Sequence, residues 1–153
     1  MKINIKRLHL DAVIPSYSKD GDAGMDLTAI CDGNVNDYGT VTFKTGLAIE
    51  IPRGYVGLVF PRSSVYKSTG RLANCVGVID SGYRGELLVN FDVSLMSYIQ
   101  GEHGLEGFKA TPYKKGDRIA QIIILPYPEV EFEEVEELSE TERGTGGYGS
   151  TGK

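Results

Sequence analysis

The chain has 153 residues, of which 41% are hydrophobic and 24% charged, and a formal net charge of −5. This length suits one domain, and the composition excludes a disordered chain and, with no apolar run near about 20 residues, a membrane-spanning helix. Two cysteines, Cys31 and Cys75, are too few for a disulfide scaffold, and the polar N-terminus is unlike a secretory signal, so we expect a cytoplasmic protein with free thiols.

Short alternating or β-branched stretches, separated by Gly, Pro, Asn and Asp, predict an all-β domain. In chain order the expected strands are Ile3–Ile5, Leu27–Ile30, Thr40–Phe43, Leu47–Ile51, Tyr55–Phe60, Cys75–Ile79, Leu87–Val93, Ile119–Leu125 and Val130–Phe132. One short helix is expected at Ser63–Ser68, with a serine as N-cap, and residues 97–112 are interpreted as a long surface loop. Many short strands with glycine-rich turns predict a jelly roll, sandwich or barrel.

Two of the predicted turns carry side chains suited to a phosphorylated ligand. Pro61-Arg62-Ser63-Ser64 offers two hydroxyls and free backbone N–H groups to an anion, with an ordinary capping turn as the alternative. Residues 77–86 are interpreted as a strand, a tight turn and a return strand, which taken alone is a simple hairpin. Beside that turn, Asp80 could orient and deprotonate a water and Tyr83 offers an aromatic face. Asn74 carries donor and acceptor groups for a pyrimidine edge.

The acidic excess lies near the C-terminus. Residues 129–142 hold eight glutamates and no Lys or Arg, whereas residues 1–128 hold 14 basic and 13 acidic residues. A nearly neutral body argues against bulk nucleic-acid binding through a basic face. We interpret the glutamate segment as a solvated strand edge and linker, with a metal-binding acidic cluster as the alternative.

The final segment, residues 143–153, contains five glycines and one large apolar side chain, Tyr148. It cannot bury enough surface to offset an ordering cost of roughly 1–2 kcal/mol per residue. From composition it is either a frayed terminus or a flap that orders over a ligand. As a flap, its backbone N–H groups and Arg143 would surround phosphates, and Tyr148 would lie on a flat base.

Five segments, taken in order, resemble the five motifs of the homotrimeric dUTPase family: Ala23–Leu27, Pro61–Ser64, Gly77–Glu86, Gly116–Gln121 and Arg143–Gly152. The resemblance implies a jelly-roll fold that assembles as a trimer and hydrolyses dUTP to dUMP and pyrophosphate with Mg²⁺. This reaction keeps dUTP low and supplies dUMP for thymidylate synthesis. It also implies a β domain over residues 1–142 and a mobile flap over residues 143–153, which closes a site formed mainly by the other two chains. Neither nucleic acid nor a membrane is an expected partner.

The resemblance assigns roles to single positions around the sugar and base. Asp80 is similar to the catalytic aspartate, which holds the attacking water and contacts the sugar 3′-hydroxyl. Tyr83 resembles the aromatic residue beneath the deoxyribose, which leaves no room for a 2′-hydroxyl and so rejects UTP. Asn74 and the hairpin backbone, Gly77 included, resemble the uracil-reading edge. Asp26 looks like the motif-one aspartate, whose role would be support of the metal–water shell or of an interface.

Other positions are similar to those that hold the triphosphate. Ser63, Ser64 and Gln121 resemble phosphate-binding residues, and Arg62 would support them across the subunit interface. Arg143 would clamp the terminal phosphate, while Tyr148 would stack on uracil. The remaining flap residues expected at the substrate are Gly146, Gly147, Gly149 and Ser150. Mg²⁺ would be held by substrate phosphates and water, without a direct protein ligand.

Two alternative functions are weighed against this one. The Arg-Ser-Ser of motif two also occurs in related dCTP deaminases, but their deaminating glutamate aligns with Asn90, which cannot act as a general acid or base. A deaminase or bifunctional enzyme is therefore the weaker alternative. The other is a nucleotide-responsive protein-interaction module that uses the flap and the 97–112 loop, and intact Asp80 and Arg143 argue against a pure binding role.

Overall fold

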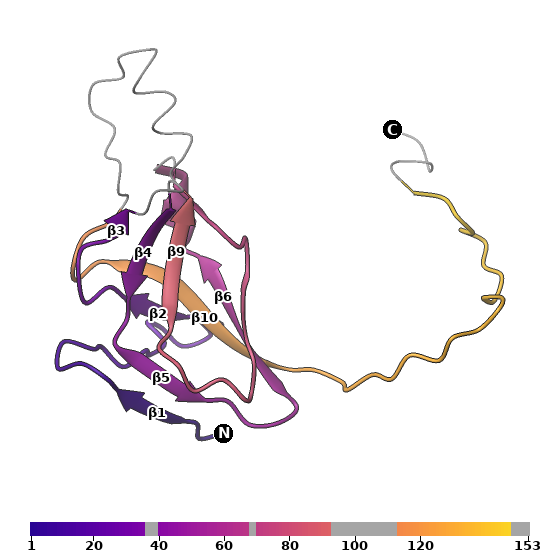
Figure 1. Ribbon diagram of the computed structural model, residues 1–153, viewed down its shortest axis with the longest axis horizontal. Coiled ribbons are helices and arrows are strands. Elements are labelled where there is room, and N and C mark those ends of the chain that lie inside the picture. The colour runs from indigo at the N-terminus through magenta and orange to yellow at the C-terminus, as the bar shows by residue number, and fades with distance from the viewer. Residues whose placement is uncertain (36–39, 68–69, 93–112, 148–153) are drawn as a thin grey trace, which may run out of the picture.

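The computed structural model describes residues 1–35, 40–67, 70–92 and 113–147 (Figure 1). Its elements over these ranges confirm the predicted all-β class, with a single 3-10 helix, η1. The elements are β1 (Asn4–Arg7), β2 (Met25–Thr28), β3 (Asn34–Val35), β4 (Thr40–Lys44), β5 (Leu47–Glu50), β6 (Tyr55–Pro61), η1 (Ser63–Lys67), β7 (Arg71–Leu72), β8 (Gly77–Ile79), β9 (Leu88–Asp92) and β10 (Arg118–Pro126).

Two four-stranded antiparallel sheets and one two-stranded sheet build a jelly-roll body (Figure 1). The first four-stranded sheet has the order β2-β10-β6-β8, and the second has the order β3-β4-β9-β7. The two-stranded sheet pairs β1 with β5. Because β10 lies between β2 and β6, it brings residues from motifs one, two and four onto neighbouring strands.

One buried cluster draws on both four-stranded sheets. In β4, Val41 and Phe43 are buried while the residues on either side of each are not, as expected for a strand with one face toward the core. Phe43 meets Phe91 of β9 edge to face, with ring centroids 6.0 Å apart. From the first sheet, β10 contributes Ile122, which is 1% exposed. This shared core fixes the sheet on which the candidate site is built.

Several predicted strands differ from those observed. The strand expected at Cys75–Ile79 covers only Gly77–Ile79, because Cys75 has a φ of +58°, which a strand does not accommodate. The hairpin expected over residues 77–86 is wrong: β8 pairs with β6 in the first sheet, while β9 pairs with β4 and β7 in the second. The turn after β8 therefore carries the chain from one sheet to the other. The short strands β3 and β7 were not predicted.

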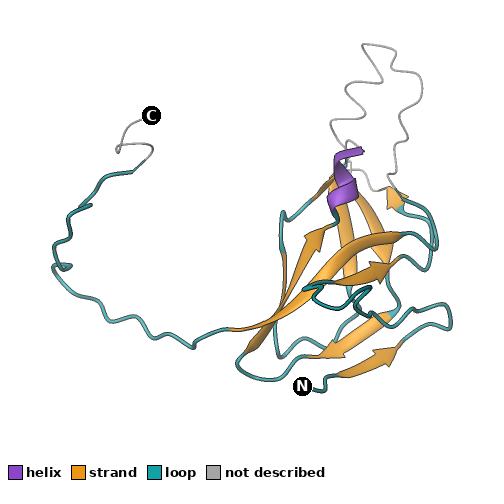
Figure 2. Cartoon of the chain, turned by 180° about the vertical axis from the view of Figure 1, so that it is seen from behind, coloured by secondary structure: helices purple, strands orange, loops and turns teal. Residues whose placement is uncertain are grey.

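The segment after β10 runs away from the β body as an extended arm, residues 127–147 (Figure 1, Figure 2). Its glutamates are exposed, which confirms their interpretation as solvated. The strand predicted at Val130–Phe132 is wrong, because this segment has no strand partner here and Phe132 is 94% exposed. Among the described residues, no three His, Cys, Asp or Glu side chains gather as a metal ion would require, so nothing in them favours the acidic metal cluster.

The predicted helix at Ser63–Ser68 is confirmed over Ser63–Lys67; Ser68 lies outside the described residues, as does the predicted loop at 97–112. Cys31 and Cys75 are free thiols, as expected. In the part of the chain that the structure covers, no helix has the length and apolarity needed to cross a membrane.

Candidate active site

The first group of candidate residues gathers where β2, β10 and β6 lie side by side. Gln121 of β10 is in register with Asp26 of β2 on one side and with Phe60 of β6 on the other. Arg62 follows β6 directly, so its side chain reaches back toward the same end of the sheet. The strand register thus unites residues 36 and more positions apart in the sequence. We call Asp26, Arg62, Ser64, Arg118 and Gln121 the arginine cluster.

Asp26 is the centre of the arginine cluster. Arg62 Nε donates to Asp26 Oδ1 at 2.8 Å, and Arg118 Nη1 donates to Asp26 Oδ2 at 3.0 Å. Both Asp26 and Arg62 keep only about a quarter of their side-chain surface exposed, at 24% and 25%. Two guanidinium groups on one carboxylate leave a net positive charge, which suits an anionic ligand.

Ser64 and Gln121 lie against this centre. Arg62 Nη1 approaches Ser64 Oγ at 3.5 Å, and Gln121 Nε2 donates to the Pro61 carbonyl at 3.0 Å. A side chain on Gly24 would come within 2.6 Å of Gln121 Oε1, so glycine there lets the amide pack closely. Ser64 is half-buried, whereas Ser63, the other serine predicted to bind phosphate, is exposed on η1. The structure therefore brings together the predicted residues Asp26, Arg62, Ser64 and Gln121, whereas Ser63 adjoins them only in the chain.

Sequence reasoning missed two members of this region. Arg118 lies within the motif-four segment without an assigned role, and its bond to Asp26 joins residues 92 positions apart. Tyr113 packs its ring against Phe91, with centroids 5.2 Å apart, beneath the cluster. Burial raises the pKa of the Tyr113 phenol, and the nearby Ser64 hydroxyl and Arg62 guanidinium partly offset that rise. A motif gives no signal for such contacts, because they arise from packing.

The second group is the turn from Asp80 to Tyr83. Tyr83 N donates to the Asp80 carbonyl at 3.1 Å, which closes a four-residue turn directly after β8. The Tyr83 hydroxyl donates to the Glu86 carbonyl at 2.9 Å, so the ring folds back over the intervening residues. A Cβ on Gly85 would lie 2.3 Å from this hydroxyl, so only glycine lets the ring lie there. The Asp80 carboxylate stays exposed and can meet a ligand or water.

Asn74 lies close to Gly77, at the start of β8. A Cβ on Gly77 would come within 3.3 Å of Asn74 Nδ2 and 3.1 Å of the Val59 Cβ. Glycine at this position therefore leaves room for the Asn74 amide beside the backbone of β8. The structure thus brings Asn74 next to the strand that leads to Asp80, as the predicted uracil-reading edge requires.

These two groups do not meet within one chain. Gly57 of β6 is opposite Ile79 of β8, which puts Asp80 near Val56, whereas Arg62 follows the other end of β6. Six residues of strand separate these positions, a distance of roughly 20 Å at about 3.3 Å per residue. In Figure 2, η1 lies at the end of the body opposite β1, while the residues after Asp80 contact β5, the partner of β1.

The predicted flap residues lie on the extended arm. Arg143 Nε donates to the Gly146 carbonyl at 3.0 Å, and Gly146 N donates to the Arg143 carbonyl at 3.0 Å. Gly144 has a φ of +49° and closes a turn with Thr141, whose carbonyl accepts a hydrogen bond from Gly144 N at 3.1 Å. Gly147 is exposed. Tyr148, Gly149 and Ser150 lie outside the described residues.

The position that would hold a deaminating glutamate is occupied by a structural amide. Asn90 Oδ1 accepts a hydrogen bond from Thr42 Oγ1 at 2.7 Å, between the paired strands β9 and β4. The Asn side-chain amide does not titrate near neutral pH, so it cannot take up or release a proton as a general acid or base. The geometry therefore gives no support to the deaminase alternative.

Comparison with known proteins gives one consistent result. A family model described as dUTPase matches residues 11–152. The chain is 43% identical to a deoxyuridine 5′-triphosphate nucleotidohydrolase of Nautilia profundicola, with all of both chains covered. A dUTPase variant of Staphylococcus bacteriophage 80alpha, solved with dUpNHpp, superposes with a TM-score of 0.78 at 28% identity, covering 99% of each chain. A dUTPase variant of phage phi11, described with a structural Mg(II) ion, has a TM-score of 0.71 at 28% identity and covers 90% of this chain and 98% of its own.

Proposed function

The chain belongs to the dUTPase family and is a dUTP diphosphatase, and we propose that Asp80 activates the water that splits dUTP into dUMP and pyrophosphate. The observation that carries this assignment is the turn itself, which closes over an exposed carboxylate and an aromatic ring. In the proposed mechanism, Asp80 orients and partly deprotonates a water for attack on the α-phosphate. The pyrophosphate then leaves, with the charge stabilised by the phosphate-binding residues.

Selection of the nucleoside is proposed for the neighbouring residues. The Tyr83 ring, held by its own hydroxyl, would lie beneath the deoxyribose and leave no room for a 2′-hydroxyl. Asn74 and the backbone at Gly77 would read the uracil edge, because the amide offers both a donor and an acceptor. Tyr148 of the flap would stack on the base from the other side.

Binding of the triphosphate is proposed for the arginine cluster and the flap. Ser63, Ser64 and Gln121 would contact phosphate oxygens, and Arg62 would add positive charge held in place by Asp26. We therefore favour Asp26 as the support of Arg62 over a role in a metal–water shell, since both of its oxygens already accept from arginines. Arg143, with the glycine N–H groups at 146, 147 and 149 and Ser150, would close over the terminal phosphate.

We further propose that three chains share each active site. The separation of roughly 20 Å between Asp80 and Arg62 along β6 supports this, because one nucleotide cannot engage both within one chain. A closed symmetric trimer solves the problem by joining the Asp80 turn of one chain to the arginine cluster of a second. The arm that leaves the body after β10 is long enough to carry the flap, residues 143–153, to another chain from the β domain, residues 1–142 (Figure 2).

Mg²⁺ is the proposed cofactor; the family supports it, and the phage phi11 dUTPase variant, described with a structural Mg(II) ion, is consistent with it. The donor set fits an ion carried by substrate: Asp80 is exposed, and Asp26 is engaged by two arginines. When bound, the ion supplies positive charge that neutralises the phosphate oxygens. A cytoplasmic location is proposed from the two free cysteines. There the reaction would keep dUTP low and supply dUMP for thymidylate synthesis.

The decisive experiment measures pyrophosphate release from dUTP, dCTP, UTP and dTTP, with and without Mg²⁺. We expect release from dUTP alone and a strong requirement for the ion. Asp80→Asn should lower turnover about 10²–10⁴-fold while the variant still binds a non-hydrolysable dUTP analogue. Normal turnover by this variant would contradict the water-activating role, and ammonia released from dCTP would revive the deaminase alternative.

A further inference from the structure

Arg84 directly follows the Asp80–Tyr83 turn, within the motif-three segment Gly77–Glu86, and it is not among the residues assigned to the substrate. Its guanidinium folds back onto the turn: Nη1 donates to the Ser81 carbonyl at 2.7 Å and to the Tyr83 carbonyl at 2.8 Å. We propose that Arg84 is a positioning residue that sets the distance and angle between the Asp80 carboxylate and the Tyr83 ring. The inference rests on the roles proposed above for Asp80 and Tyr83.

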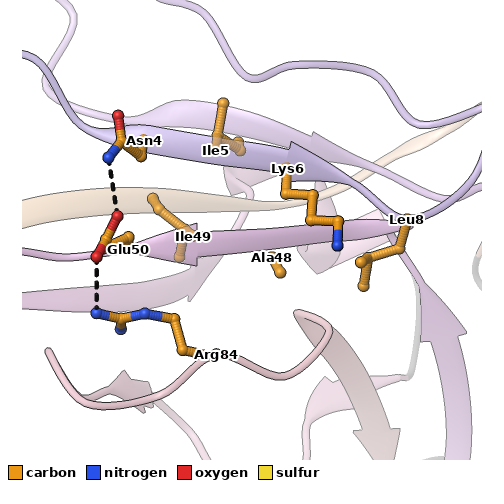
Figure 3. A pocket seen from close by; sticks show the side chains of 8 residues that line it. All are labelled: Asn4, Ile5, Lys6, Leu8, Ala48, Ile49, Glu50 and Arg84. Atoms are coloured by element: carbon orange, nitrogen blue, oxygen red, sulfur yellow. Dashed lines mark hydrogen bonds and ion pairs between the residues drawn. The ribbon is translucent and has the colours of Figure 1, made fainter.

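The same guanidinium is anchored to the rigid body of the protein. Its Nη2 donates to Glu50 Oε1 at 3.3 Å, and the other oxygen of Glu50 accepts from Asn4 Nδ2 at 2.8 Å. We call the hydrogen-bonded series Arg84–Glu50–Asn4 the relay. Figure 3 shows it running from the loop that carries Arg84, across Glu50, to Asn4 on the neighbouring strand. Asn4 and Glu50 are also direct partners in the register of β1 and β5. The turn is thus connected to the paired strands β1 and β5, in addition to its own hydrogen bond between Tyr83 N and the Asp80 carbonyl.

The relay stands at one end of a groove of about 360 Å³ between β1, β5 and the Arg84 loop (Figure 3). The Asn4 hydrogen bond, followed by the positive charge of Arg84, lowers the pKa of Glu50 below its ordinary value of 4.5. Glu50 is therefore an anion at neutral pH, and it faces the guanidinium as a charged acceptor.

This relay contributes little to stability and much to geometry. The side chains of Arg84 and Glu50 are about half exposed, at 51% and 50%, and exposed ion pairs contribute little to folding. The two carbonyls that Arg84 holds would be hydrated in its absence, so their loss leaves no buried polar group unpaired. Catalysis is more demanding, because a displacement of about 1 Å in a reacting group can lower a rate by about 10²-fold. A positioning residue should therefore affect turnover and selectivity without a matching effect on folding.

The test compares Arg84→Ala and Arg84→Lys with Arg71→Ala, a matched control. Arg71 also forms an exposed ion pair, with Asp92 at 2.9 Å, but it lies on β7 of the second sheet. We expect Arg84→Ala to lower kcat/KM for dUTP roughly 10- to 100-fold and to lower the ratio of kcat/KM for dUTP to that for UTP. Its melting temperature should match that of Arg71→Ala. Relative to Arg84→Ala, Arg84→Lys should recover part of kcat/KM for dUTP and part of the dUTP/UTP ratio. An ammonium group can donate to one of the two carbonyls, but it cannot bond both carbonyls and Glu50 at once as the guanidinium does.

The inference is overturned if Arg84→Ala keeps the wild-type kcat/KM and dUTP/UTP ratio. It is also overturned if the kinetic loss only follows a fall in melting temperature, because that pattern indicates a structural role. Asp80→Asn and Tyr83→Ala, measured beside these variants, separate this outcome from failure of the proposed function. If those two variants are impaired and Arg84→Ala is not, only the role of Arg84 fails. Wild-type behaviour of Asp80→Asn would instead remove the proposed role of Asp80 on which the inference rests.

Discussion

The guanidinium of Arg62 is held by the carboxylate of Asp26, with 2.8 Å between Nε and Oδ1. Arg62 follows β6 and Asp26 lies in β2, so the contact spans the central strand β10. Arg118 of β10 takes the second oxygen of Asp26 at 3.0 Å. One half-buried carboxylate thereby orients two cations at the end of the sheet where the proposed phosphate-binding residues gather. Without that carboxylate, the two guanidinium groups would repel each other.

Asp26→Ala should therefore reduce both stability and activity. Because the carboxylate is half-buried and engages two charges, we expect the free energy of unfolding to fall by about 1–3 kcal/mol. Denaturant unfolding of the wild type and the variant at the same protein concentration measures this difference in the free energy of unfolding. Asp11→Ala, which removes a more exposed ion pair with Lys115, is the control and should lower the free energy of unfolding much less than Asp26→Ala does. Equal effects of the two variants would contradict a special role for Asp26.

Shared active sites predict complementation between two inactive variants. Asp80→Asn and Arg62→Ala remove groups from opposite ends of β6, which different chains would supply to one site. Random mixing of equal amounts should rebuild about one quarter of the sites, because each intact group is drawn independently with a probability of about one half. Pyrophosphate release after joint refolding measures the recovery. Each variant refolded alone is the control, and no recovery in the mixture would show that one chain forms the whole site.

Gly85→Ala should relax the selection against UTP. The added methyl group would lie 2.3 Å from the Tyr83 hydroxyl, so the ring must leave its bond to the Glu86 carbonyl. Because Tyr83 is 42% exposed, we expect little change in melting temperature but a lower ratio of kcat/KM for dUTP to that for UTP. Gly82→Ala adds the same group to the same turn in open space and is the matched control. An unchanged ratio in Gly85→Ala would argue that the ring does not select the sugar.

The Glu50 carboxyl should titrate below its ordinary pKa of 4.5, mainly because of the Asn4 hydrogen bond and then because of Arg84. A lowered folded-state pKa means that the interaction stabilises the protein above pH 4.5 and is lost as the pH falls through the folded value. NMR titration of the Glu50 carboxyl carbon measures this pKa. Asn4→Ala should raise it more than Arg84→Ala does. The reverse order would mean that charge, and not the hydrogen bond, dominates.

Local turns and the positions of most strands could be predicted from the sequence, as β4, β5, β6 and β10 show. The turn after β8 contains Gly82, and it forms where the Gly and Asp residues indicated. The paired strand expected after it was wrong, because β9 completes the other sheet and the choice of partner depends on the whole core. The alternation at Val130–Phe132 suggested a strand, but a strand needs a partner, and within the described chain this segment has none.

The candidate site divides in the same way. By itself, the sequence predicted which chemical groups the proposed site uses: the carboxylate of Asp80, the ring of Tyr83 and the hydroxyls of the Arg-Ser-Ser segment. Those groups follow from residue type and from spacing within short motifs. Only the tertiary structure decided that Asp26 holds Arg62, 36 positions away, and that Arg84 caps the turn from a relay anchored on β1. It also decided that Asp80 and Arg62 lie at opposite ends of β6. The physical reason is that strand register is set by burial of the shared core, which no single motif contains.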